Sequence, residues 1–243
     1  MATTYSPNIV KDDLIVHLDC GDLSTFSSGS LIWSDLSGNN HSGSLNDGTI
    51  GTDSGSINVM AFNGEDHHIT IDRPDRSDGD PCTQEWWQSE ECQWNALIIE
   101  QTYAIVYTID PDGHGYHIYV NDGDGSAELN KGSQAARLYS TGSDGRSDFQ
   151  HFCTTFLLQV LCPLFESGNL TLYVNGELLQ TNTSITANSP ATNTTHLGGD
   201  TVLNHRLKGN IAIYRHYHRA LTAKQVKQNY DAQKNRFRNL NRA

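Results

Sequence analysis

Residues 207–230, LKGNIAIYRHYHRALTAKQVKQNY, carry the strongest structural signal of this chain. Ile211 and Ile213 alternate there with Ala212 and Tyr214, the period of two expected of a β-strand with one buried face. The residues that follow lose this alternation and carry a helix-start signal. The order predicts a last strand followed at once by a short helix that docks on the rest of the domain.

Three features mark the start of that helix. Thr222 stands at the N-cap position, where its hydroxyl can accept a hydrogen bond from the amide of Gln225. The Gln225 side chain can reach back toward the Thr222 amide, which completes a capping box. Leu221 and Val226 have the spacing of a hydrophobic staple. We therefore predict a C-terminal unit over 222–243 that consists of the helix and a basic arm.

The rest of the chain has the composition of one all-β domain. Of its 243 residues 36% are hydrophobic, and 21 glycines lie scattered between short apolar runs with many Asn, Asp and Ser residues. Many short strands separated by turn residues are typical of a β-sandwich, and sandwiches of this length occur as single domains. No segment has the composition of an interdomain linker. We expect residues 1–221 to form one sandwich.

Two hairpins can be predicted locally. Residues 103–109 and 116–120 both alternate with period two and are separated by the turn at Pro111 to Gly115. A second hairpin is centred on Asn175 and Gly176, the dipeptide preferred in two-residue type I′ turns because both central residues need positive φ.

The order of several short motifs resembles a known family. The segments are LIVHLD (14–19), WSDLSGN (33–39), FNGEDHHI (62–69), LYVNGE (172–177), Leu197 to Gly199, and the 209–230 region. Together they resemble laminin-G-like, concanavalin A-like jelly-roll domains, especially the version repeated in structural proteins of tailed bacteriophages. His68 stands where that family usually has tyrosine. The resemblance does not extend over residues 72–150, so no role can be transferred to that region.

This resemblance implies a concanavalin A-like jelly-roll β-sandwich with a short C-terminal helix. It also implies a non-enzymatic virion structural or adhesion protein of a tailed bacteriophage, such as a capsid decoration or tail-associated protein, which acts by surface binding. Its partners would be other virion proteins or copies of itself, and it would be made in the host cytoplasm. A carbohydrate-binding lectin domain is the alternative, with surface glycans as partners.

The charge of the chain is unevenly distributed. Residues 1–205 hold 6 Lys and Arg against 27 Asp and Glu, a net charge of −21, whereas residues 206–243 hold 10 against 1, a net charge of +9. An acidic body makes nucleic acid an unfavourable partner. The basic arm is predicted to dock on an acidic neighbour, unless it is a solvated helix face with a frayed end. The candidate partner-binding residues are Lys224, Lys227, Lys234, Arg236, Arg238 and Arg242. If the arm docks in this way, removal of residues 234–243 is expected to leave folding intact but to abolish incorporation into the particle.

Three tryptophans, Trp86, Trp87 and Trp94, lie close together among acidic residues. Exposed indole rings could stack on a sugar and form the ligand-binding site of a lectin. Alternatively, the three rings fill a small core beneath a long loop, and this packing interpretation is the one that such a cluster favours.

The sequence predicts no resident cofactor. Calcium is the one candidate, because Asp110, Asp112, Asp122 and Asp124 lie in predicted turns. They do not match an EF-hand, since Asn121 replaces the twelfth-position glutamate. His216 and His218 project to one face of the last strand, but no third metal ligand can be identified. We therefore predict no metal site and expect ordinary turn aspartates.

No catalytic residue is predicted either. No glutamate is followed two residues later by aspartate, so the acid pair of β-glucanases is missing, as are G-x-S-x-G and H-E-x-x-H.

The N-terminal residues lack the apolar stretch of a signal peptide, and no run is long enough to span a bilayer. We therefore expect the cysteines to be buried, reduced thiols, although a disulfide between Cys82 and Cys92 could close the loop between them.

Overall fold

The computed structural model describes residues 8–25, 31–46, 49–52, 58–72, 81–89, 96–100, 103–109, 115–121, 136–139, 149–162, 165–186, 194–198 and 208–238. Within them the chain forms two antiparallel sheets and one α-helix, with a short 3-10 turn at Leu23–Thr25. The predicted all-β jelly-roll class with a C-terminal helix is confirmed. In the described residues, no helix is long and apolar enough to cross a membrane.

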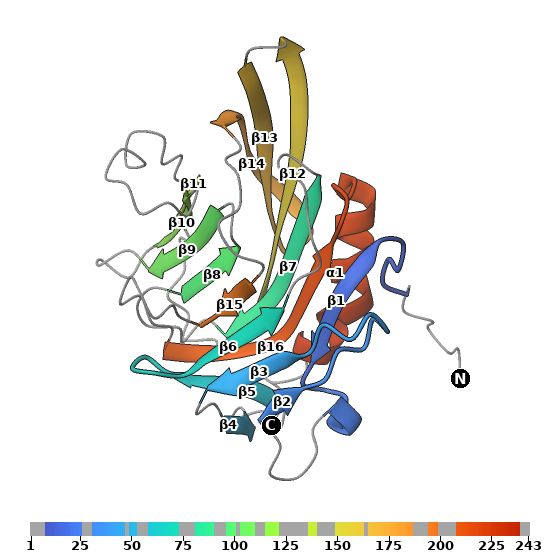
Figure 1. Cartoon of the computed structure of the whole chain (residues 1–243), viewed down its shortest axis with the longest axis vertical. Helices are drawn as coiled ribbons and strands as arrows, with labels where there is room; N and C mark the ends of the chain where they lie inside the picture. Colours follow the sequence, from blue (N-terminus) through green and yellow to red (C-terminus); the bar gives the residue numbers. More distant parts are fainter. Residues whose placement is uncertain are drawn as a thin grey trace.

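The first sheet has eight strands in the order β14-β13-β12-β7-β16-β5-β4, and β1 also pairs with β16. Its strands are β1 (Leu14–Asp19), β4 (Thr49–Thr52), β5 (Asn58–Asn63), β7 (Cys82–Ser89), β12 (Phe149–Cys162), β13 (Phe165–Val174), β14 (Glu177–Thr186) and β16 (Lys208–Tyr217). We call it the helix-bearing sheet, because α1 (Ala223–Arg238) lies along it beside β16 and β1 (Figure 1).

The second sheet also has eight strands, in the order β11-β10-β9-β8-β15-β6-β3-β2. Its strands are β2 (Ile32–Trp33), β3 (Gly43–Asn46), β6 (His68–Asp72), β8 (Ala96–Glu100), β9 (Tyr103–Ile109), β10 (Gly115–Asn121), β11 (Ala136–Tyr139) and β15 (Thr194–Leu197). The strands β8 to β11 follow one another along the chain, whereas β15 comes from much later in the sequence and inserts between β6 and β8.

The strand β16 organises the helix-bearing sheet. One edge of it pairs with β7, and the other edge pairs with β5 near Lys208 and with β1 near Tyr217. This register places Arg215 between His17 on β1 and Glu85 on β7. Residues from the start, the middle and the end of the chain thus lie in one row across the sheet.

Both faces of β16 are buried, which corrects the prediction of a single buried face. Every residue from Ile211 to Tyr217 is buried, and Ala212, Ile213, Tyr214 and Tyr217 are wholly inaccessible. One face of the strand meets the core between the sheets, and the other is covered by α1. The alternation in the sequence therefore separates two different apolar environments rather than core from solvent.

The capping of α1 is as predicted. The amide of Gln225 donates to Thr222 Oγ1 at 3.4 Å, and the amide of Thr222 donates to Gln225 Oε1 at 3.0 Å. Leu221 and Val226 are buried in one cluster with Tyr217, which confirms the staple. The helix starts at Ala223, directly after its cap.

Both predicted hairpins are present in the described strands. Tyr116 on β10 pairs with Ile109 on β9, although the connecting residues 110–114 lie outside the described part. At the other hairpin, Asn175 and Gly176 have φ values of 51° and 79°, and Val174 pairs with Glu177. A Cβ atom at Gly176 would lie 3.0 Å from Tyr230 of α1, so this turn also contacts the helix.

Candidate binding site

The segment WSDLSGN forms a turn fastened to β1 by its own polar side chains. Asp35 accepts hydrogen bonds from the amides of His17 (2.8 Å), Ser37 (2.9 Å) and His41 (3.1 Å). Asn39 donates from Nδ2 to the carbonyls of Leu14 (3.0 Å) and Ile15 (3.2 Å). A carboxylate can accept several such bonds at once, and Asp35 thereby holds the turn against β1.

The FNGEDHHI segment makes a second turn of the same kind. Asn63 Oδ1 accepts from the amides of Glu65 and Asp66 at 2.8 and 3.1 Å, and its Nδ2 donates to Asp66 Oδ1 at 2.6 Å. The next residue, Gly64, has a φ of 81°. Both motifs that resemble the laminin-G-like family thus form hydrogen-bonded turns. Within the described ranges, no three His, Cys, Asp or Glu side chains are placed to hold a metal ion.

A cavity of about 550 Å³ opens between β1, the WSDLSGN turn and α1. We call it the β1–α1 cavity. Its wall combines apolar and polar side chains and is formed by Asn8, Ile9, Lys11, Leu14, His17, Asp22, Leu36, Ser37, Ala232 and Gln233. Its volume lies in the range typical of small-molecule sites, which are largely apolar with a few converging polar groups.

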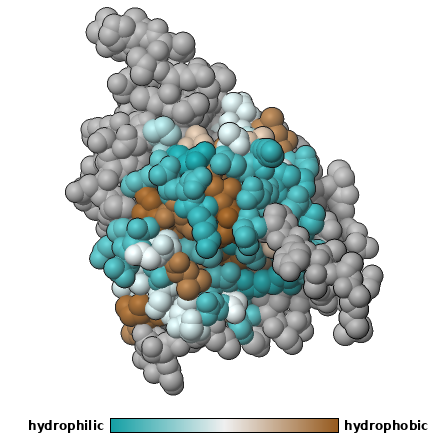
Figure 2. Space-filling view, turned by 90° about the vertical axis from the view of Figure 1, so that its right-hand side faces the viewer, coloured by the Kyte–Doolittle hydropathy of each residue, from teal (hydrophilic) through white to brown (hydrophobic). Residues whose placement is uncertain are grey.

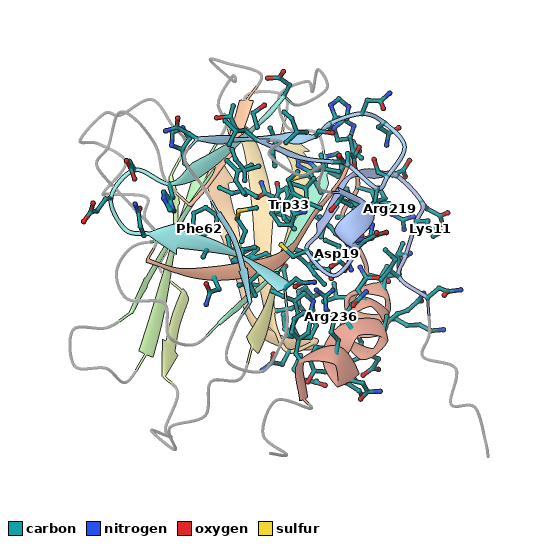
Figure 3. All side chains as sticks on the ribbon, turned by 90° about the horizontal axis from the view of Figure 1, so that it is seen from below. Lys11, Asp19, Trp33, Phe62, Arg219 and Arg236 are labelled. Carbon is teal, nitrogen blue, oxygen red and sulfur yellow. The ribbon has the colours of Figure 1, made fainter. Side chains whose placement is uncertain are left out.

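The side of the molecule that carries α1 and β1 is mostly hydrophilic, with small hydrophobic patches between polar groups (Figure 2). Leu36, at the cavity, is 38% exposed. Lys11 and Arg219 lie together on this side, away from the buried Trp33 (Figure 3).

His17 is held neutral at the cavity wall. Burial, followed by the positive charge of Arg215, lowers the pKa of His17 from 6.5 to about 4. The carboxylates of Asp19, Glu85 and Asp35 raise the pKa of His17, but by less than burial and Arg215 lower it. The imidazole therefore offers one donor and one acceptor nitrogen at neutral pH.

Behind His17 lies a buried polar network that the sequence analysis missed. Arg215 Nη1 donates to Glu85 Oε1 at 2.7 Å, and both side chains are wholly buried. Asn229 of α1 donates to Glu85 Oε2 at 2.7 Å and accepts from the amide of Val10 at 2.8 Å. The network fixes α1 and the N-terminal segment to the sheet. The signal in the sequence was a charged residue next to large apolar residues, with Glu85 before Trp86 and Arg215 after Tyr214.

The predicted basic arm forms much of α1. Lys227 and Lys234 both pair with Asp231, and their hydrogen bonds, with Lys227 first, lower the pKa of Asp231. Lys224 is exposed. By their spacing, Lys224, Lys227 and Lys234 share one side, which we call the basic face of α1. The backbone of Arg238 ends the helix, and Arg242 lies outside the described residues.

Arg236 makes a contact within the domain that the sequence did not predict. Its Nη1 pairs with Asp19 Oδ1 (Figure 3). The guanidinium also packs against Gly21, where an added Cβ atom would lie only 2.6 Å from Arg236 Cζ. Arg236 therefore joins the end of α1 to the end of β1. Its charge is paired with a carboxylate of another element, whereas Lys227 and Lys234 pair only within α1, so the structure gives Arg236 an anchoring role.

The tryptophan site proposed from the sequence is not formed by Trp86 and Trp87. Each is 1% exposed, so neither ring is available to stack on a sugar. Trp87 instead stacks on Phe237 and Tyr230 of α1, with ring centroids 4.3 and 5.7 Å apart. The packing interpretation holds for these two buried residues, and Trp87 packs beneath α1 rather than beneath a loop. Trp94 lies outside the described residues.

The remaining candidates are distributed as follows. The rings of His216 and His218 lie edge to face, 5.6 Å apart, and His216 is buried. Cys20 and Cys82 are buried, and burial raises the pKa of the Cys20 thiol. Outside the described residues lie Cys92 and the candidate calcium ligands Asp110, Asp112, Asp122 and Asp124.

Comparison with known protein families assigns the chain to a superfamily. A laminin-G-like family model, described as the concanavalin A-like lectin/glucanases superfamily, matches residues 63–227. The chain belongs to this superfamily. The match spans more than half of the chain and includes β16 and the start of α1. A search of curated protein sequences gives no significant match.

Solved structures of this superfamily fold are similar over nearly the whole chain. They include the binding domain of Paraclostridial Mosquitocidal Protein 1 (15% identity, TM-score 0.58, 90% of this chain and 52% of that one). They also include the binding domain of botulinum neurotoxin serotype D (14%, 0.60, 92% and 52%). A third is domain 4 of AbnA, an extracellular arabinanase from Geobacillus stearothermophilus, solved with arabinotriose (17%, 0.59, 90% and 98%). The chain spans about half the length of the toxin domains and nearly all of the arabinanase domain.

Proposed function

We propose that this chain is a non-enzymatic virion structural or adhesion protein of a tailed bacteriophage, a capsid decoration or tail-associated protein that acts by surface binding. The observation that carries the proposal is the basic face of α1 on a strongly acidic body. Lys224, Lys227 and Lys234 lie on one side of a helix that is firmly packed on its other side. Such a rigid cationic surface is suited to an acidic neighbour, a copy of the same chain included.

The rigidity of α1 favours binding by this surface. Lys227 Nζ and Lys234 Nζ lie 5.3 Å and 5.6 Å from the ring centre of Tyr230. The same ring stacks on the buried Trp87. Because the lysines are held over a fixed aromatic ring, less side-chain entropy is lost when a partner binds them. The phage setting itself rests on the resemblance of the sequence motifs.

A carbohydrate-binding lectin domain is the second candidate. The β1–α1 cavity favours it, because it has the size and the mixed lining of a small-ligand site. The named binding functions of the similar toxin and arabinanase domains support binding rather than turnover as the activity. The proposal includes no cofactor.

The first experiment asks whether the protein is part of the particle. We expect mass spectrometry of purified phage particles to detect it in many copies. Absence from the particles would refute the virion role. The basic face is tested by the triple variant Lys224→Glu, Lys227→Glu, Lys234→Glu, which we expect to lower incorporation at least tenfold.

The matched control changes the same three lysines to arginine and so keeps their charge. This control is expected to incorporate normally, and both variants should unfold at similar denaturant concentrations. If the charge-reversed protein folds and incorporates as well as the arginine control, the basic face is not the attachment surface. Strong glycan binding by a protein absent from particles would favour the lectin instead.

A further inference from the structure

Large apolar side chains are exposed at a few places in the described part of the chain, namely at Leu31, Ile32, Leu36 and Leu178. Leu178, Leu31 and Ile32 are the most exposed of them, at 60%, 57% and 40%. An exposed apolar group with charged groups around it is typical of a surface that binds another protein. The charges beside these three residues therefore indicate which partner they meet.

Leu178 lies beside the basic face of α1. It pairs across β13 and β14 with Tyr173, which is buried in one cluster with Val226 of α1. Because side chains directly opposite each other in an antiparallel pair share a face, Leu178 lies on the helix side of the sheet. The turn that precedes β14 also contacts the basic face, since a Cβ atom at Gly176 would lie 3.0 Å from Lys227 Cδ. We call Leu178 and the basic face together the apolar–basic surface.

The charge of the apolar–basic surface is positive. Its three lysines outnumber the carboxylates described beside them, which belong to Asp231 on α1 and to Glu177 next to Leu178. An acidic surface with exposed apolar groups of its own is therefore the complement of this surface.

The turn between β5 and β6 has such a surface. Glu65 and Asp66 are both exposed there. The nearby β3 links this turn to the exposed apolar pair. The amide of Leu45 donates to the carbonyl of Leu31 at 2.8 Å, and the side chain of the next residue, Asn46, donates to the Asp66 carbonyl at 3.4 Å. We call the following residues the apolar–acidic surface: Leu31, Ile32, Glu65 and Asp66.

The two surfaces lie on different sides of the molecule. In Figure 1, and again in Figure 3, the turn between β5 and β6 projects on the left, whereas α1 lies on the right. The two surfaces of one copy therefore do not meet, but one surface can meet the other surface of the next copy. A contact between two different surfaces adds copies in one direction and generates a chain or a closed ring of copies.

The apolar and the charged groups have different roles in such a contact. Exposed ion pairs contribute little free energy, because water and salt screen them. Removing Leu31, Ile32 and Leu178 from water contributes more, so these residues supply most of the affinity. The charges decide which surfaces meet, since two surfaces of the same sign repel each other.

We propose that copies of this chain associate head to tail, with the apolar–basic surface of one copy on the apolar–acidic surface of the next. The inference rests on the proposed function, in which the basic face is the attachment surface. It names a second copy of the chain as the acidic neighbour.

The first test is sedimentation velocity of the full chain at increasing protein concentration. We expect species larger than a dimer, because the copies at the two ends each keep one unoccupied surface. Leu178→Gln should weaken the association about tenfold, since it removes a leucine from the contact. The matched control is Leu36→Gln, at an exposed leucine outside both surfaces, which should associate like the unchanged chain. A chain that stays monomeric, an assembly that stops at the dimer, or equal association of the two variants would overturn the proposal.

The second test exchanges the charges of the two surfaces. One variant carries Lys224→Glu, Lys227→Glu and Lys234→Glu, and the other carries Glu65→Lys and Asp66→Lys. Each variant alone has two surfaces of the same sign, so each should self-associate at least about tenfold more weakly than the unchanged chain. An equimolar mixture should recover the association, because each variant then meets the opposite charge on the other. Absence of recovery between two folded variants would show that these surfaces do not meet.

Denaturant unfolding checks that each variant is folded. If a multiple variant is not, the single changes Lys224→Glu and Glu65→Lys repeat the mixing experiment with a smaller perturbation of each surface. Both residues are exposed. The expected order of association is the same, with the mixture stronger than either variant alone.

This proposal and the virion role fail separately. A purified chain that associates head to tail but is absent from particles overturns the virion role alone. A chain that is present in particles, and whose incorporation depends on the basic face, but that stays monomeric when purified overturns the head-to-tail contact alone.

Discussion

Arg215 and Glu85 form an ion pair of 2.7 Å in which neither side chain is accessible to solvent. Asn229 of α1 completes it by donating to the second carboxylate oxygen of Glu85. The pair thus joins the two central strands of the helix-bearing sheet to the helix that covers them. Removing one partner would leave an uncompensated buried charge, which is strongly destabilising.

We expect Glu85→Ala to lower the free energy of unfolding by about 3–5 kcal/mol, because the guanidinium of Arg215 then stays buried without its carboxylate. Urea denaturation measures this. In the double variant Glu85→Leu, Arg215→Met, both charges are replaced by apolar groups, and much of the stability should return. A double variant no more stable than Glu85→Ala would show that the pair matters through other contacts.

Phe237→Ala is expected to lower the free energy of unfolding by about 3–5 kcal/mol, since it leaves a cavity against Trp87. Removing residues 234–243 should be at least as damaging, because it deletes both Phe237 and the Arg236 pair with Asp19. This reverses the expectation from the sequence that this segment is dispensable for folding. Thermal unfolding of the truncated chain decides the matter, and an unchanged midpoint would contradict the packing of α1.

Gly176→Ala should destabilise the protein by about 1–2 kcal/mol, because a φ of 79° disfavours a Cβ atom and Tyr230 lies 3.0 Å away. The control is Asn175→Gly at the neighbouring position, whose φ is 51°. That change introduces no Cβ clash, so its effect should stay within a few tenths of a kcal/mol. Denaturant midpoints compare the two, and equal losses would argue against the strained turn.

His17 should make stability depend on pH in a defined window. Its pKa is lowered to about 4 in the folded protein, below the 6.5 of the unfolded chain, so the unfolded state binds more protons between these values. The contribution is therefore fully present above pH 6.5 and is lost as pH falls toward 4, by roughly 2–3 kcal/mol.

The measurement is urea denaturation at pH 7 and pH 5 together with an NMR titration of the imidazole. His17→Gln should reduce the difference between the two pH values, whereas His41→Gln, at the more exposed turn, should retain it. An NMR pKa of His17 near 6.5 would rule out this pH dependence.

The fold could be predicted from the sequence largely because its signals are local. The capping box at Thr222 and Gln225 and the Asn175-Gly176 turn depend on residues within a few positions of one another. Strand periodicity is local in the same sense. The site was less predictable, because the lining of the β1–α1 cavity comes from three segments that lie far apart in the sequence.

The tryptophans show why the sequence alone left their packing partners unidentified. Clustered indole rings have the same pattern whether they face solvent or a helix that arrives more than a hundred residues later. Tyr230 and Phe237 of α1 cover Trp87, and no residue near Trp87 in the sequence predicts these contacts. The ion pair of Arg236 could not be predicted for the same reason, because its carboxylate partner, Asp19, lies more than two hundred residues earlier in the chain.

The sequence by itself determined the all-β class, the turns, the start of the helix and the uneven charge, since each depends on neighbouring residues or on composition. Only the tertiary structure decided which charges remain available to a partner, which aromatic rings are buried and where a cavity opens. These depend on long-range contacts, in which β1, β7 and β16 meet beneath α1 and His17, Arg215 and Glu85 come to share one row.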